Sequence, residues 1–304
     1  MNDPNLVLRE GPWQHRMIPA NGTRIHAALT GPADGTAPLV VLLHGFPQNW
    51  FAWRHQLVAL GEQGYRVAAL DLRGYGASDK PPGRYDLPVL ADDVAAVIRS
   101  LGAARAVVVG HGLGGQVAWS MPSLTPGVVR AVATLAAPHP ARLAAVAART
   151  APLRTIRWLA RVQAPWFPER ALTHGTMAYR VLEDWSAPGW RCGQAQIYAD
   201  AMRLSFSAHS AMEQVRWLVR STPRSDGRAY RRAVSATVRV PVLAIHGGAD
   251  RFLPVAAADR DRDLTASGYR RVVIADAGHF LPEEAPEQTM AALTAWLGRV
   301  HRED

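Results

Sequence analysis

The chain of 304 residues is long enough for one α/β domain with an insertion, or for two small domains. Hydrophobic residues make up 48% of it and charged residues 19%, which excludes a disordered or fibrous protein. The formal net charge is +9, and because Lys80 is the single lysine, arginines carry nearly all of the positive charge. These arginines are spread along the chain without a recognisable nucleic-acid-binding motif. We therefore expect a solvated basic surface and no nucleic-acid partner.

Cysteine content and hydropathy restrict the remaining classes of protein. Cys192 is the single cysteine, so the chain forms no internal disulfide and has no cysteine-rich metal site. The first residues lack a basic start followed by an apolar run, and no apolar stretch reaches the ~18 residues that cross a bilayer. We expect a cytoplasmic protein without a membrane partner.

The first predicted elements are strands. Residues 14–20 and 24–30 have strand-like patterns on either side of Asn21-Gly22, which is a strong hairpin signal. Unbroken apolar runs follow, and such runs are typical of parallel strands buried on both faces of a sheet. They cover residues 39–43, 67–70, 106–109, 129–136, 240–245 and 271–275.

Helical patterns alternate with these strands. Apolar residues at helical spacing precede Gly61 and Gly102, and a helix that follows residue 115 is expected to end at Pro122. The last predicted helix has Pro286 in its first turn. Alternating strands and helices predict an α/β fold with a doubly wound, mostly parallel sheet and right-handed crossovers.

The alternation stops between about Pro138 and Arg232. This region has no strand pattern, and helices are expected around residues 143–148, 153–162, 194–204 and 212–219. We interpret it as a helical insertion over the carboxyl ends of the strands. The chain then divides into a core of residues 1–137 and 236–304 and a cap of residues 138–235.

The stretch from Val107 to Gly115 reads VVVGHGLGG and predicts a strand, a sharp turn and a helix. This is the context of a nucleophile elbow, in which small residues flank the nucleophile at two positions on either side. Gly110 and Gly114 are the small residues, so Gly112 stands where the nucleophile belongs. Glycine tolerates the strained backbone of such a turn but has no side chain that could attack a substrate.

Four further motifs occur in a characteristic order. They are HGFPQNWFAWRHQ (44–56), DLRGYGASDKP (71–81), HGGADRFLP (246–254) and AGHFLPEEAP (277–286). With the elbow, they resemble the α/β-hydrolase superfamily, and most closely its epoxide-hydrolase-like branch. The resemblance implies an eight-stranded sheet with a helical cap after the sixth strand and no cofactor. It also implies a small apolar or ester-like ligand and a monomer or homodimer.

The resemblance assigns roles to four residues. The backbone N–H groups of Phe46 and Leu113 would form an oxyanion hole, since fixed amide dipoles stabilise developing negative charge. Asp250 matches the triad acid and His279 the triad histidine. A histidine oriented by a buried carboxylate on one ring nitrogen can act as general base with the other.

This chain departs from the family pattern at the nucleophile and in the cap. The family has GHDxGG or GHSxGG at the elbow, whereas GHGLGG at Gly112 allows neither an alkyl-enzyme nor an acyl-enzyme ester. The two cap tyrosines of epoxide hydrolases align with Trp158 and Val219. If that alignment is shifted, Tyr179, Tyr198 and Tyr230 are the remaining candidates.

The expected substrate pocket combines these cap positions with two core residues, His111 and Pro47. Several histidines follow strand ends, namely His44, His111, His139 and His279. His44 and His111 match positions whose imidazole is structural in the family, and we expect no metal site.

Two functions remain open from the sequence. The first is a hydrolase without a covalent nucleophile, in which His279 held by Asp250 activates water or removes an acidic proton from an activated ester, a lactone or a related substrate. The alternative is an inactive homologue that binds a small ligand in a tryptophan-rich cap. Retention of both Asp250 and His279 favours the first.

Overall fold

The computed structural model describes residues 6–33 and 35–302. Eight strands form one sheet in the order β1-β2-β4-β3-β5-β6-β7-β8. The strands are β1 (Gln14–Ala20), β2 (Thr23–Thr30), β3 (Leu39–Leu43), β4 (Arg66–Leu70), β5 (Ala106–His111), β6 (Val129–Leu135), β7 (Val242–Gly247) and β8 (Tyr269–Ile274). The pairs β1-β2 and β2-β4 are antiparallel, and the other pairs are parallel. The doubly wound, mostly parallel sheet predicted from the sequence is therefore confirmed.

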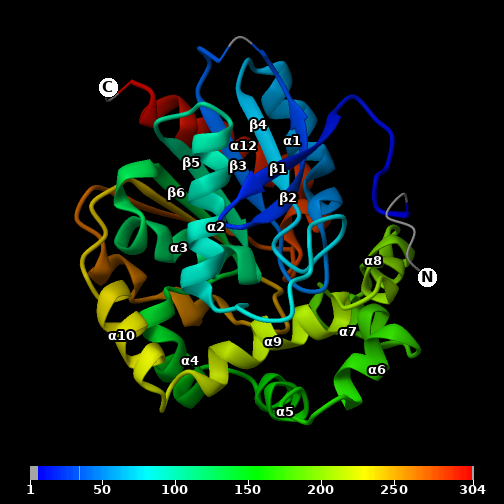
Figure 1. Cartoon of the computed structure of the whole chain (residues 1–304). Coiled ribbons are helices and arrows are strands. Elements are labelled where there is room, and N and C mark those ends of the chain that lie inside the picture. The colour runs from blue at the N-terminus through cyan, green and yellow to red at the C-terminus, as the bar shows by residue number, and fades with distance from the viewer. Residues whose placement is uncertain (1–5, 34, 303–304) are drawn as a thin grey trace.

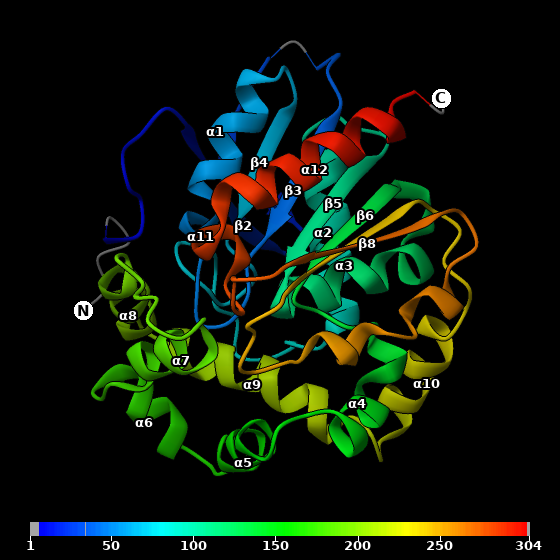
Figure 2. The same ribbon diagram turned by 180° about the vertical axis from the view of Figure 1, so that it is seen from behind.

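Helices cover both faces of this sheet. On one face lie α1 (Arg54–Glu62), α11 (Leu281–Glu284) and α12 (Pro286–Val300), and on the other lie α2 (Leu87–Ser100) and α3 (Gly112–Leu124) (Figures 1 and 2). Every residue of β3 and β5 is buried because helices cover both faces of these central strands. The prediction of a fully buried strand fails for β8, which lies at the sheet edge and exposes 46% of Val273.

The chain between β6 and β7 is helical and gathers at one end of the sheet (Figure 1). It contains α4 (Leu143–Arg149), α5 (Leu153–Arg161), α6 (Phe167–Thr173), α7 (Met177–Trp185), α8 (Ala195–Arg203), α9 (Ser207–Arg220) and α10 (Ser225–Val234). Helices α6, α7 and α10 were not predicted. Helix α6 is short and α10 is strongly polar, and both features weaken a helical pattern in the sequence. No helix in the described ranges is both long and apolar enough to cross a membrane.

The predicted end of α3 at Pro122 is wrong. The helix begins at Gly112 and continues through Pro122 to Leu124. A proline in a helix removes one N–H donor and disturbs the carbonyl four residues earlier. Here that loss falls in the last turn, and the amide of Thr125 still closes the helix by donating to Met121 at 2.8 Å.

A buried ion pair joins the turn after β4 to α2. Arg73 donates from Nε and Nη2 to the two carboxylate oxygens of Asp93, both at 2.6 Å. Both side chains are about 95% buried. Such a bidentate pair satisfies both charges where water cannot, so Arg73 has a structural role.

A second buried carboxylate anchors the start of the helical region. The amide of His139 donates to Oδ2 of Asp261 at 3.1 Å, which ties the chain after β6 to the short 3-10 helix Asp261–Leu264. Burial raises the pKa of Asp261 from 3.8 to about 7. The folded protein therefore binds this proton more tightly than the unfolded chain does, and the resulting stabilisation is lost as pH rises from about 4 through 7.

Replacement Asp93→Ala is expected to lower the free energy of unfolding by ~3–5 kcal/mol, because it leaves the Arg73 guanidinium buried and unpaired. Urea denaturation followed by circular dichroism measures this change. The matched control is Asp92→Ala, since Asp92 is the exposed neighbour on the same helix. Equal destabilisation by both variants would contradict the structural role of the ion pair.

Replacement Asp261→Asn is expected to stabilise the protein at pH 8 by up to ~4 kcal/mol and to have little effect at pH 4. The amide oxygen can still accept from His139, while the cost of burying a charge disappears. Thermal denaturation across this pH range tests the prediction, with the exposed Asp276→Asn as control. A gain that does not vary with pH would show that Asp261 is not protonated in the folded state.

Candidate active site

The elbow between β5 and α3 is closely packed everywhere except at Gly112. A Cβ atom at Gly110 would lie 2.2 Å from the Gly114 carbonyl oxygen, and one at Gly114 would lie 2.4 Å from the Leu43 carbonyl oxygen. Gly112 has φ +52°, and a Cβ built there would meet only His279 Nε2 at 3.5 Å and Gly45 Cα at 3.6 Å within 4 Å. The position predicted for a nucleophile therefore faces His279 across open space.

His279 and Asp250 lie in direct contact. His279 Nδ1 is 2.8 Å from Asp250 Oδ2, and both side chains are almost completely buried. The other oxygen, Asp250 Oδ1, accepts from the amides of Phe252 at 2.7 Å and Leu253 at 2.8 Å. The carboxylate is thus held in one orientation and leaves His279 Nε2 directed toward Gly112.

Glu284 fixes the backbone around His279, and the sequence analysis did not single it out. Its carboxylate accepts from the amides of Gly278 and Phe280 at 2.8 Å and from that of Ala187 at 2.9 Å. These contacts hold the chain on both sides of His279 and tie it to the helical region. The acidic residues of the AGHFLPEEAP motif, at the start of a helix, were the available signal for this role.

His111 holds the same loop through a hydrogen bond to the backbone of His279. Its Nε2 lies 2.8 Å from the carbonyl oxygen of His279, and since that carbonyl can only accept, the ring donates. Burial lowers the pKa of His111 well below its ordinary value, so this imidazole is neutral. His111 is fully buried and does not line the cavity described next, and neither does Pro47.

The two expected oxyanion-hole residues flank the elbow. Phe46 and Leu113 both line the cavity beside Gly112. First-turn N–H groups of a helix have no carbonyl partner within that helix, and the Gly114 amide is engaged by the His44 carbonyl at 3.1 Å. The first-turn amides give the amino end of α3, which begins at Gly112, a partial positive charge.

A cavity of about 280 Å³ lies over this centre. Its core wall contains Gly112, Phe46, Leu113 and His279, and its opposite wall comes from α4, α5, α9 and α10. Trp158 and Val219 line it, as the alignment with the cap tyrosines implied. Most lining residues are apolar, which is typical of a small-molecule site.

Aromatic rings form the wall next to His279. Trp185 stacks on Phe252 with ring centroids 3.7 Å apart and lies edge-on to His279 at 5.2 Å. Trp158 packs against Trp185 at 4.9 Å and Phe46 at 5.6 Å. This cluster shields the pair of Asp250 and His279 from bulk water.

The three remaining candidate tyrosines differ in position. Tyr179 is outside the cavity and donates to Gln196, and Tyr198 is fully buried and also does not line the cavity. Tyr230 does line it, with its hydroxyl 2.8 Å from Ser120 Oγ. Ser120 in turn donates to the Gln116 carbonyl, which leaves Ser120 embedded in α3, away from Gly112.

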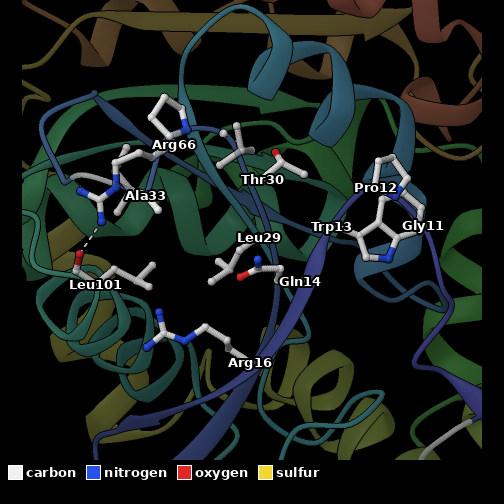
Figure 3. Close-up of a pocket in the computed structure, with 14 residues that line it drawn as sticks. Gly11, Pro12, Trp13, Gln14, Arg16, Leu29, Thr30, Ala33, Arg66 and Leu101 are labelled. Carbon is white, nitrogen blue, oxygen red and sulfur yellow. Dashed lines mark hydrogen bonds between the residues drawn. The ribbon is translucent and has the colours of Figure 1, made fainter.

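The described residues contain no metal cluster, but they form a second cavity at the opposite end of the sheet. Within the described ranges, no three His, Cys, Asp or Glu side chains are placed to hold a metal ion. A larger cavity of about 510 Å³ lies between Trp13, Arg66 and Leu101 (Figure 3). It opens at the amino ends of β3 and β4, whereas ligands of open α/β sheets bind at the carboxyl ends of strands.

Known proteins are similar to this chain over most of its length. A family model described as alpha/beta hydrolase fold matches residues 38–286. Epoxide hydrolase A of Mycobacterium tuberculosis is 31% identical, with 93% of this chain and 96% of that protein covered. Epoxide hydrolase B of the same organism is 47% identical over a shorter segment, 42% of this chain and 36% of that protein, so this match spans about a third of the relative's length.

Solved structures agree with this assignment. The crystal structure of epoxide hydrolase A from Mycobacterium thermoresistibile superimposes with a TM-score of 0.80 at 27% identity, covering 94% of this chain and 98% of that one. The shared sheet, the elbow between β5 and α3, and the match over residues 38–286 lead to one conclusion. The chain belongs to the alpha/beta hydrolase fold family, with epoxide hydrolases among its relatives.

Proposed function

We propose that this protein is a small-molecule hydrolase that acts without a covalent nucleophile. The observation that carries the proposal is the intact contact between His279 and Asp250, with Nε2 facing the open space at Gly112 inside an apolar cavity. In this proposal residues 138–235 form the cap that closes the cavity. The substrates would be small apolar esters or lactones, and no cofactor takes part.

The proposed reaction uses water as the nucleophile. His279 donates Nδ1–H to Asp250, so its Nε2 has a lone pair that removes a proton from a water molecule. The oxygen of that water attacks the substrate carbonyl, and the amides of Phe46 and Leu113 stabilise the oxyanion, at ~3 kcal/mol per donor. The protonated His279 then returns the proton to the leaving alcohol, while Asp250 stabilises the imidazolium.

Esters fit this site better than epoxides do. An opening epoxide needs a proton donor for its oxygen, and the indole of Trp158 and the side chain of Val219 stand at the positions aligned with the cap tyrosines. The hydroxyl of Tyr230 is already paired with Ser120. An ester carbonyl needs no cap hydroxyl, because backbone amides can stabilise its oxyanion.

The second candidate is a ligand-binding protein without turnover. The aromatic wall built from Trp158, Trp185 and Phe252 favours an apolar ligand whether or not it reacts. The two candidates differ in one respect: a binding protein has no need of the ionisable pair of His279 and Asp250.

Replacement His279→Ala is expected to lower kcat/KM for a small activated ester, such as p-nitrophenyl acetate, by ~10²–10⁴, the usual contribution of a general base. Asp250→Asn should lower kcat with less effect on KM, because it misorients the imidazole and destabilises its charged form. Release of p-nitrophenolate measures both.

The matched control for these variants is His174→Ala, since His174 is an exposed histidine outside the cavity. If His279→Ala keeps its activity, the hydrolysis does not depend on the cavity and takes place at the protein surface or in bulk solvent. Tight binding of an apolar ester without its hydrolysis by the unchanged protein would support the ligand-binding candidate.

Replacement Gly112→Asp is expected to give slow alkylation by reactive epoxides, without rapid turnover. The carboxylate has room beside His279, although the positive φ at residue 112 costs ~1–3 kcal/mol in a non-glycine residue. Because the hydroxyl of Tyr230 is paired with Ser120, no acidic tyrosine hydroxyl is free at the cavity wall, and this slows ring opening by ~10²–10⁴. Mass spectrometry should show the added mass of one epoxide on the protein.

The double variant Gly112→Asp/His279→Ala is the control, because it retains the carboxylate but cannot activate water for release. Rapid multiple turnover of an unactivated epoxide by Gly112→Asp would contradict the prediction. It would mean that a cap tyrosine such as Tyr230 leaves its partner and donates to the epoxide oxygen.

A further inference from the structure

We propose that the space beside Gly112 binds the carboxylate group of a small organic acid. In the proposed position, one carboxylate oxygen faces Nε2 of His279 and the other faces the amide donors at the start of α3. The inference rests on the proposed function in one respect: a carboxylic acid is the product of ester hydrolysis, so the product would be held where it forms. The ligand class is a short aliphatic carboxylate, with formate and acetate as the smallest examples.

The first argument is steric. Beside Gly112, a built Cβ has ordinary contacts at 3.5 and 3.6 Å, whereas at Gly110, Gly114 and Gly115 it would come within 2.4 Å of neighbouring atoms. Of the four glycines of the elbow, Gly112 is therefore the one with room for further atoms beside it. This room is continuous with the cavity, because Gly112 and His279 both line the cavity wall.

The second argument is the unpartnered ring nitrogen of His279. The residue is 2% exposed, and its Nδ1 is engaged by Asp250. Within the described part of the chain, Nε2 has no hydrogen-bond partner, and it lies 3.5 Å from the Cβ position at Gly112. When the ring is protonated, Nε2 carries a hydrogen, and a carboxylate oxygen at this place would accept it in a charge-assisted hydrogen bond.

The third argument is charge. Among the residues that line the cavity, the charged or chargeable groups apart from the Tyr230 phenol are His279 and Arg231, both basic, and no Asp or Glu side chain lines it. Asp250 lies behind the imidazole, on the side of Nδ1, and does not line the cavity. The amino end of α3 adds partial positive charge from its first-turn amides.

The geometry favours a carboxylate over a monatomic anion. The donors belong to two separate elements, the loop that carries His279 and the first turn of α3. A planar carboxylate has two acceptor oxygens and can bond to both donors at once, whereas chloride offers a single centre. The apolar remainder of the cavity suits the alkyl part of the acid.

The test is a titration of the ¹⁵N-labelled protein with sodium formate at constant ionic strength, followed through the imidazole resonances in NMR spectra. His279→Ala identifies the resonances of His279. We expect these resonances to shift and saturate, with a dissociation constant on the order of millimolar. Chloride should bind at least tenfold more weakly.

Two glycine variants locate the site. Gly112→Ala puts a methyl group into the proposed space and should weaken formate binding at least tenfold. Gly189→Ala is the matched control, because Gly189 also has a positive φ, +83°, but a Cβ there meets nothing within 4 Å. This control carries the same type of backbone strain and should bind formate as the unchanged protein does.

Three results would overturn the inference: His279 resonances that do not move at formate concentrations far above millimolar, equal binding of chloride and formate, or undiminished formate binding by Gly112→Ala. A separate assay of ester hydrolysis distinguishes this failure from failure of the proposed function. If hydrolysis depends on His279 but is not inhibited by formate, the carboxylate site is disproved and the proposed function stands. If the protein binds formate saturably but hydrolyses no ester, the proposed function is disproved and the carboxylate site stands.

Discussion

The close approach of β5 and α3 is the constraint on which the candidate site depends. Gly110, Gly114 and Gly115 leave no space for side chains, so the amino end of α3 packs directly against the carboxyl ends of β5 and β3. This contact places Gly112 and Leu113, in the first turn of α3, at the cavity wall. It also holds residue 112 in a left-handed backbone conformation that glycine adopts without strain.

His279 is held with similar rigidity from several directions. Asp250 orients the ring, Glu284 holds the amides on both sides of it, and His111 donates to its carbonyl oxygen. Each of these partners is itself buried or held by backbone donors, so the imidazole has little freedom to turn. A ring fixed in this way can direct one nitrogen to a reacting molecule without reorganisation, which is the source of electrostatic catalysis in enzymes.

The helical region supplies the apolar environment. Trp185 lies edge-on to His279 and packs against Trp158, and together with Phe252 from the chain after β7 these rings exclude water, which strengthens charge interactions within the cavity. The tyrosine that this region contributes to the cavity wall, Tyr230, is paired with Ser120 of α3. In the proposed function, His279 and backbone amide donors face a wall without a free tyrosine hydroxyl, and this balance would favour carbonyl substrates over epoxides.

Local patterns in the sequence determined the sheet, the elbow and the motifs around His279 and Asp250. Unbroken apolar runs identify central strands such as β3 and β5, and glycines at fixed spacing identify a tight turn, because both effects act over a few residues. Edge position is a property of the whole sheet, so the exposure of β8 could not be read from its composition. The same limit applies to α6 and α10, whose sequences are short or polar and whose helical state depends on packing.

What only the tertiary structure decided is the distance between groups far apart in the chain. It placed Glu284 on the amides beside His279, excluded Pro47 and His111 from the cavity wall, and brought Tyr230 to that wall already paired with Ser120. It also showed that the space at Gly112 is open while the other glycines of the elbow are closely packed. The sequence shows that residue 112 is a glycine and has no side chain. Whether an open space results depends on atoms that folding brings there from other segments.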